Sequence, residues 1–186
     1  MKNIFIILLA FALCSCSNEE SVNKPKGNET TQYVESIIAN ASTNIDFDAA
    51  IEKLTSKALV IERLFWGTDS TWEEDESPLW VGIVFKDITC YSYWYEPCYG
   101  SYPALKLRCD KHKYTFEKRE GGLYLISENH IENRIQEARL IDYKENTIFF
   151  MGELPFPSSY RTSFYICTTD FDIQEKWDAI IEEQDK

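Results

Sequence analysis

The stretch EARLIDYKENTIFFMG, residues 137–152, contains two short runs rich in leucine, isoleucine and aromatic residues. The runs cover Glu137–Tyr143 and Thr147–Gly152, and only Lys144–Asn146 separates them. Their composition is typical of β-strands. Because a parallel crossover needs about a dozen residues or more, a join this short predicts that the two strands are antiparallel neighbours.

Runs of the same kind lie on both sides of this hairpin. They predict strands at Ala58–Trp66, Leu79–Lys86, Ile88–Tyr95, Ala104–Cys109, Lys113–Lys118, Gly122–Ser127 and Arg161–Thr168. Short joins with turn residues, such as CDKH at 109–112 and EGG at 120–122, again indicate antiparallel pairing. The sequence therefore predicts a mainly β fold. We expect an antiparallel meander of eight or nine strands that forms a barrel or a strongly curved sheet.

Apolar side chains at helical spacing flank the predicted strands. Before residue 57 they predict one or two short helices, from Tyr33, Ile37 and Ile38 and from Phe47, Ala50, Ile51 and Leu54 with Asp46 as N-cap. After the last strand they predict an amphipathic helix packed on the sheet, from Ile173, Trp177, Ile180 and Ile181 with Asp170 or Asp172 near its start.

The stretch TCYSYWYEPCYGSYP, residues 89–103, is the most aromatic part of the chain. Strand alternation places its side chains on two faces, with Tyr91, Tyr93 and Tyr95 on one and Cys90, Ser92, Trp94 and Glu96 on the other. Pro97 is predicted to end the strand, because it lacks a backbone donor. An outward tyrosine face would favour binding, and an inward face would make the tyrosines core or cavity lining. The candidate ligand-binding residues are Tyr91, Tyr93, Trp94, Tyr95, Tyr99 and Tyr102.

The N-terminus has the pattern of an export signal. The ten apolar residues from Ile4 to Leu13 are fewer than the roughly 20 that a membrane-spanning helix needs. The following LCSC resembles a bacterial lipobox, with Leu13 and Ser15 in the places that precede a lipidated Cys16. We expect a lipoprotein signal peptide at 1–15, a lipidated cysteine and tether at 16–31, and one β-rich domain at 32–186. An ordinary secretory signal is the alternative.

The residues after Cys16 suggest where an anchored domain would lie. SNEES, with Glu19 and Glu20, is similar to the acidic export signal of surface lipoproteins in the Bacteroidota. Acyl chains such as palmitate on Cys16 would attach the protein to the outer membrane, with the domain exposed at the cell surface. A plain hydrophilic linker is the other interpretation of this segment.

Four further cysteines follow the signal: Cys90, Cys98, Cys109 and Cys167. In an oxidising compartment an even number is compatible with two disulfides, and four cysteines allow three connectivities. Pairing Cys90 with Cys98 is the most local choice and leaves Cys109 with Cys167. Buried free thiols, or a single bridge, are equally open.

The charges and motifs restrict the possible chemistry. A net charge of −12 disfavours nucleic acid as a partner, because phosphate backbones would be repelled. No catalytic motif, phosphate loop or cofactor motif is present, so we predict no enzyme activity and no cofactor. The combinations Glu128, His130 and Glu132, and Cys109 with His112, are weak candidates for a metal site and a thiol–imidazole pair. We predict no metal site.

The order of elements resembles a known family. A helical lead, a first strand that runs into Trp66, a meander of short strands, and a late pair like ARLIDYKENTIFFMGEL at 138–154 look like the small lipocalin-like lipoproteins of the Bacteroidota. The lipocalin G-x-W is not matched, since RLFWG places Trp66 before Gly67. The resemblance covers roughly Phe47 to the C-terminus, and it implies a barrel with a ligand cavity.

Two functions follow from these patterns. The first is a surface-anchored lipoprotein that binds a small amphipathic or carbohydrate ligand through an aromatic-rich β face or barrel mouth. The second is an interaction or structural lipoprotein that binds another envelope protein and has no small-molecule pocket.

Overall fold

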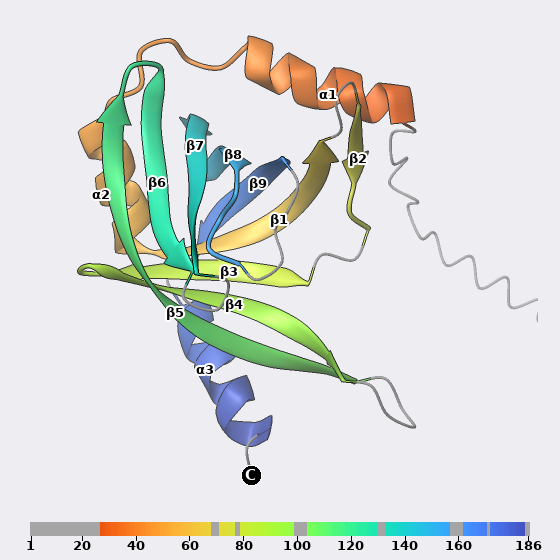
Figure 1. The fold of residues 1–186 in the computed structure, drawn as a ribbon, viewed down its shortest axis with the longest axis vertical. Helices are drawn as coiled ribbons and strands as arrows, with labels where there is room; N and C mark the ends of the chain where they lie inside the picture. The colour runs from red at the N-terminus through yellow and green to blue at the C-terminus, as the bar shows by residue number, and fades with distance from the viewer. Residues whose placement is uncertain are drawn as a thin grey trace, which may run out of the picture.

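The computed structural model describes residues 27–67, 71–76, 79–98, 104–129, 133–156, 162–170 and 172–184. Its helices are α1 (Gly27–Ala39), α2 (Phe47–Ser56) and α3 (Ile173–Gln184). Its strands are β1 (Ala58–Gly67), β2 (Trp72–Glu74), β3 (Trp80–Lys86), β4 (Thr89–Cys98), β5 (Ala104–Arg119), β6 (Gly122–Asn129), β7 (Arg134–Lys144), β8 (Thr147–Gly152) and β9 (Ser163–Asp170). Figure 1 shows a strongly curved sheet with helices around it.

The sheet is a closed antiparallel barrel, which confirms the predicted fold class. Strands β3 to β9 pair in chain order, and β1 pairs with both β3 and β9, so eight strands form the closed wall. The ninth strand, β2, pairs only with the last part of β1, from Phe65 to Gly67. Closure leaves most backbone donors and acceptors of the wall paired, which removes the exposed edges of an open sheet.

The hairpin predicted from residues 137–152 forms as expected. Strands β7 and β8 pair from Lys144 and Thr147 at the turn to Ala138 and Gly152 at the far end. Glu145, in the turn, has a positive φ of 50°. A bulge between Leu140 and Asp142 shifts the register and increases the local twist.

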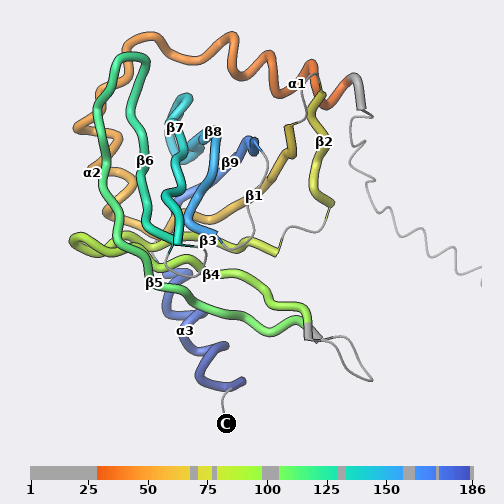
Figure 2. Tube along the Cα trace, viewed as in Figure 1, coloured from red at the N-terminus to blue at the C-terminus, as the bar shows by residue number. Residues whose placement is uncertain are grey.

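Two predictions along β4 and β5 are wrong. The CDKH segment is not a turn, because β5 runs unbroken through it and pairs first with β4 and then with β6. Pro97 does not end β4, and it pairs with Leu105. The Tyr95 N–H donates to the Leu79 carbonyl at 2.6 Å. Because alternate residues of a strand direct their backbone nitrogens to the same side, the next nitrogen on this side of β4 belongs to Pro97. Pro97 lies in the part of β4 that pairs only with β5, so its missing N–H leaves no hydrogen bond of the sheet unmade (Figure 2).

Three apolar clusters hold the helices to the barrel. The interior cluster includes Leu59, Ile83, Leu125 and Phe150, and Ala50 and Leu54 of α2 pack into it at one end of the barrel. The other two helices cover outer faces of the wall. Helix α1 packs through Val34 on Phe65, Ile141, Phe164 and Ile166, and α3 packs through Trp177 on Val84, Tyr93 and Leu107.

The sequence predicted all three helices, but the tether predicted at 16–31 overlaps the first turn of α1. Asp46 caps α2 as predicted, and its carboxylate accepts from the backbone N–H groups of Asp48 and Ala49 at 3.1 Å. Helix α1 begins at Gly27, inside the segment assigned to the tether at 16–31. Thr31 is buried, and its hydroxyl accepts from the backbone N–H of Trp72 at 2.9 Å. The remaining tether and the signal, 1–26, lie outside the described residues.

Large side chains fill the barrel interior. The rings of Trp80 and Phe156 stack with centroids 5.3 Å apart and an interplanar angle of 7°. Both residues are buried, and the Gln136 side-chain amide donates to the Phe156 carbonyl at 2.7 Å. The chain that leaves β8 is thus fixed inside the barrel opposite α2. In the described residues this interior is a packed core.

Candidate functional site

The tyrosine face of β4 points outward, but a helix covers it. Tyr93 is only 1% exposed, and its ring lies 4.7 Å from that of Trp177 in α3. Its hydroxyl donates to Asp178 at 2.8 Å. Burial, together with this hydrogen bond, raises the pKa of Tyr93 above its usual value. Tyr91 and Tyr95 belong to the same helix-covered cluster. On the face predicted to bind a ligand, Tyr93 is therefore part of the core, and Tyr91 and Tyr95 are partly buried.

Trp94 points to the opposite side, as the alternation predicted. It packs against the interior cluster, and its indole N–H donates to Asp110 at 2.7 Å. Tyr99 and Tyr102 lie outside the described residues. Among the candidate aromatic residues that the structure describes, Tyr91, Tyr93 and Tyr95 thus lie on the face that α3 covers, and Trp94 lies on the opposite face.

Neither proposed disulfide is present. Cys90, Cys109 and Cys167 are free. Cys90 and Cys98 lie at opposite ends of the extended strand β4, roughly 26 Å apart at the usual rise per residue, whereas bridged Cα atoms lie within about 7 Å. Cys109 pairs with Tyr93 and lies beside it on the wall face that α3 covers, whereas Cys167 is in the interior cluster. Burial raises the pKa of Cys90 to about 12 and that of Cys109 to about 11, so these thiols stay protonated at neutral pH.

The two residues of the candidate thiol–imidazole pair do not lie together either. Cys109 and His112 are three positions apart on β5, so their side chains point to opposite faces of the wall. His112 is buried, and its Nε2 lies 2.9 Å from the Ser92 hydroxyl. His130 and Glu132 lie outside the described residues. Within the residues that the structure describes, no cluster of three metal-ligating side chains occurs.

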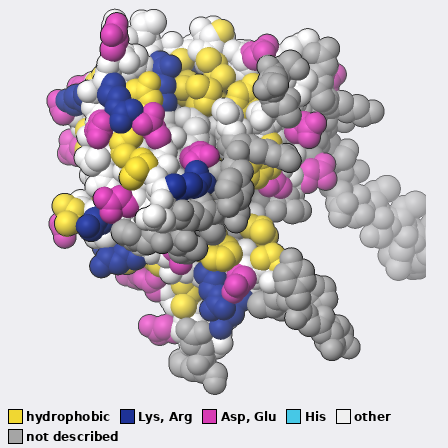
Figure 3. Space-filling model, in the orientation of Figure 1, with side chains coloured by type: hydrophobic (Ala, Val, Ile, Leu, Met, Phe, Trp, Pro, Cys, Tyr) yellow, Lys and Arg dark blue, Asp and Glu magenta, His cyan; other side chains and the backbone are white. Residues whose placement is uncertain are grey.

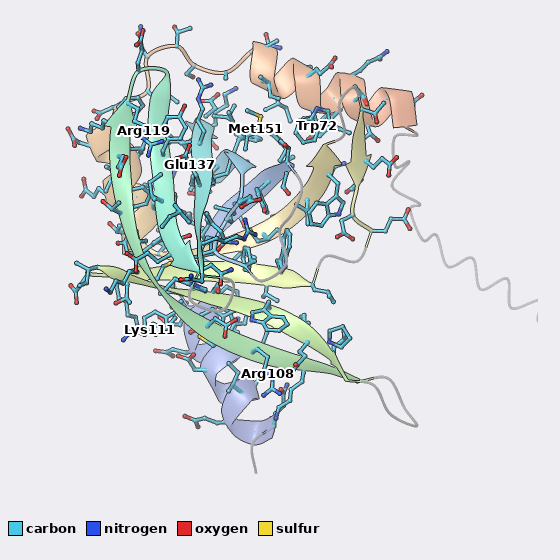
Figure 4. The ribbon with its side chains drawn as sticks, viewed as in Figure 1. Trp72, Arg108, Lys111, Arg119, Glu137 and Met151 are labelled. Atoms are coloured by element: carbon cyan, nitrogen blue, oxygen red, sulfur yellow. The ribbon has the colours of Figure 1, made fainter. Side chains whose placement is uncertain are left out.

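A pocket of about 560 Å³ lies at the rim of the barrel, where the connection from α1 to α2 passes the β5–β6 hairpin. We call it the rim pocket. Its apolar lining comes from Ile38, Ala41, Ile45, Phe47, Leu140, Ile141 and Met151. Its polar lining includes Ser42, Thr43, Arg119 and Arg139. In Figure 4, Arg119 and Glu137 lie near this hairpin, and Met151 lies below α1.

Two arginines with different surroundings border the rim pocket. The guanidinium of Arg119 donates to Glu117 at 2.7 Å and to Glu137 at 2.5 Å. These bonds, first to Glu117 and then to Glu137, raise the pKa of Arg119 further above its usual value. Arg139 is paired in the sheet with Tyr124 and Met151, which carry no charge at neutral pH. In the described part of the chain it forms no ion pair. Glu117 and Glu137 are thus bound to Arg119, and Arg139 has no ion-pair partner among the described residues.

The hairpin backbone makes room for Arg139. Gly122 has a positive φ of 149°, and a Cβ atom added there would lie 3.1 Å from the Arg139 Nε atom. The arginine side chain therefore lies against the bare backbone of Gly122. Around this hairpin, Figure 3 shows basic and acidic side chains interspersed with hydrophobic ones.

Sequence reasoning missed the rim pocket. It treated EGG as a turn and Glu137–Tyr143 as an ordinary strand, and both assignments are sound. The signal that could have been noticed is Arg139 itself, a basic residue between Ala138 and Leu140 in a predicted strand. The lack of an ion pair at Arg139 could not be inferred, because Arg119 and Glu117 belong to a different strand, β5.

Comparisons with known proteins add no relative: no protein-family model, no curated protein and no solved structure matches this chain. Among the described residues, none of the helices has the length and apolar character needed to cross a membrane. The argument for a function therefore comes from the residues of this chain.

Proposed function

We propose that this protein is a binding module for a small amphipathic ligand, which it holds in the rim pocket. The observation that carries the proposal is a pocket of about 560 Å³ with an apolar lining and a charged edge. Pockets for small molecules are usually about 300–1,000 Å³, with apolar walls and a few polar groups that orient the ligand.

The position of the pocket differs from the β face and barrel mouth first expected to bind. Tyr93 on that face is covered by α3, and Trp80 and Phe156 stack within the interior cluster. The rim pocket instead combines segments that are far apart in the sequence, with Ser42 on one side and Met151 on another. The alternative function, an interaction lipoprotein, was defined by having no small-molecule pocket. The rim pocket is therefore the feature that favours ligand binding over it.

Filling the rim pocket is expected to weaken binding. We expect the full chain to bind the neutral fluorescent probe 1-N-phenylnaphthylamine at one saturable site. Ser42 is exposed and lines the pocket, so Ser42→Trp should place an indole in it without disturbing the core. Probe affinity should fall at least about tenfold, or about 1.4 kcal/mol. Fluorescence titration measures this change, and far-UV circular dichroism confirms the fold.

The matched control is Ala179→Trp, which adds the same side chain at an exposed position of α3 outside the pocket. This variant should bind the probe as the unchanged protein does. Equal affinities for all three proteins would place the probe elsewhere and would contradict the proposed function.

We also propose that the domain is anchored to the outer membrane through acyl chains on Cys16, with the pocket exposed at the cell surface. The LCSC pattern and the acidic SNEES segment support this proposal. Because a multiply acylated cysteine is a stable anchor, loss of its sulfur should release the protein.

The lipid anchor predicts a difference between two neighbouring cysteines. In bacteria fed a clickable palmitate analogue, Cys16→Ser should lose labelling and leave the membrane fraction. Cys14→Ser should keep both, because bulky Leu13 precedes Cys14 where a lipobox has a small residue. Equal labelling of the two variants would disprove the assignment of Cys16. Separately, protection from protease added to intact cells would disprove exposure at the surface.

A further inference from the structure

We infer that the ligand of the rim pocket carries an anionic head, a carboxylate or a phosphate, which Arg139 binds while an apolar body lies on the pocket wall. This inference rests on the proposed function and specifies the chemical class of its ligand. It would make the protein a receptor for anionic amphiphiles.

The first argument is the distribution of charge. The chain has 31 acidic and 19 basic residues, and several of its described basic side chains, such as Arg63 and Arg134, form ion pairs with carboxylates. Near the rim pocket, however, Arg119 binds both Glu117 and Glu137. Arg139 forms no ion pair in the part of the chain that the structure describes. A protein with excess acid thus presents, at the edge of the rim pocket, a cation that has no ion-pair partner among the described residues.

The second argument is the position of the guanidinium. Arg139 and Glu137 lie on the same face of β7, and Arg119 holds Glu137 at 2.5 Å. Glu137 is therefore paired with Arg119, and it forms no ion pair with Arg139 among the described residues. A guanidinium offers a planar fork of donors that matches the two oxygens of a carboxylate or phosphate.

The third argument is the apolar wall beside this cation. Ile38, Ile45, Phe47, Leu140, Ile141 and Met151 all line the pocket. A free inorganic anion would leave this surface uncovered, whereas an alkyl or ring system would bury it. Arg139 and the wall together fit a ligand that is charged at one end and apolar at the other.

Three probes that share one alkyl chain test the head group. Decanoate, decyl phosphate and 1-decanol are titrated against the full chain with bound 1-N-phenylnaphthylamine, and displacement is followed by fluorescence. Since hydrogen bonds to a charged group are among the stronger ones, decanoate or decyl phosphate should bind about tenfold tighter than decanol. Comparing the two anions distinguishes a carboxylate ligand from a phosphate ligand.

Arg139→Gln should remove the preference for the anions, because it should weaken the binding of decanoate and decyl phosphate more than that of decanol. Arg139 is exposed, so this change should not disturb the fold. The matched control is Lys176→Gln, which removes one positive charge from the exposed side of α3 and should keep the preference. Arg139→Lys keeps the charge but loses the fork, and it should weaken both anions.

Each outcome decides between the two proposals. Equal binding of decanol and both anions would overturn the anionic head and leave the proposed function intact. Loss of the preference in Lys176→Gln as well would overturn the role of Arg139, because it would show a general charge effect. Failure of all three probes to displace 1-N-phenylnaphthylamine, with no effect of Ser42→Trp on that dye, would overturn both proposals.

Discussion

Trp177→Ala is expected to lower the free energy of unfolding by about 3–5 kcal/mol, the usual cost of truncating a large buried aromatic side chain. Trp177 is 5% exposed and contacts the ring of Tyr93. It also lies against β3, where a Cβ atom added to Gly82 would be 2.4 Å from the indole. The indole therefore fills a space that the bare backbone of Gly82 leaves, and alanine would leave a cavity.

Urea unfolding followed by circular dichroism measures this loss. The control is Ile180→Ala on the same helix, which truncates a side chain that is 37% exposed and should cost less than about 1 kcal/mol. Trp177→Leu should be intermediate, and it keeps the test informative if the alanine variant does not fold. A loss below about 1 kcal/mol for Trp177→Ala would show that α3 contributes little to the stability of the barrel.

Gly152→Ala is expected to cost about 3 kcal/mol or more, for two separate reasons. Gly152 has a φ of 125°, which an L-residue adopts only with strain of about 1–3 kcal/mol. A Cβ atom there would also lie 2.4 Å from the Glu137 carbonyl oxygen and 2.9 Å from the Ala138 Cα atom. These are backbone atoms of β7, so the end of the β7–β8 pair must move apart.

Gly121→Ala separates the two contributions. Gly121 also has a positive φ, of 94°, but the nearest atom to an added Cβ is the Tyr124 hydroxyl at 3.9 Å. This control should show the backbone strain alone, so Gly152→Ala should destabilise clearly more in chemical unfolding. Hydrogen exchange should increase at the Glu153 N–H, which donates to the Glu137 carbonyl at 2.7 Å. Equal losses for the two glycines would show that the close approach at Gly152 is relieved without cost.

Local pattern was sufficient to predict most of the fold. Alternation and short joins predicted the β7–β8 hairpin and the face on which each residue of β4 lies. They failed at Cys109–His112, where a charged run suggested a turn. There, Asp110 and Cys109 simply alternate between the two faces, and one long strand serves two neighbours. They also missed β2, since Trp72–Glu74 is a strand only because the end of β1 offers it an edge.

The candidate site could not be predicted in the same way. The alternation of Tyr91, Tyr93 and Tyr95 was correct, but no local signal shows that α3 returns to cover them. Likewise, no local signal shows that Arg119 of β5 pairs with Glu137 of β7, two strands away, while Arg139 forms no ion pair among the described residues. Burial and charge compensation are properties of the assembled barrel. A sequence pattern can therefore indicate candidate residues, but it does not show how exposed they are.

The closure of the barrel through β1 and β9 determines when this chain can fold. Ala58 pairs with Asp170, and the pairing continues to Trp66 with Ser163. As the protein is synthesised, β1 has no partner for this edge until almost the entire chain has emerged. Contacts of such long range make folding slow, so the nascent protein stays open and its edges stay available for aggregation. A messenger RNA truncated before the codons for β9 would therefore yield an open, aggregation-prone sheet in place of a smaller folded domain.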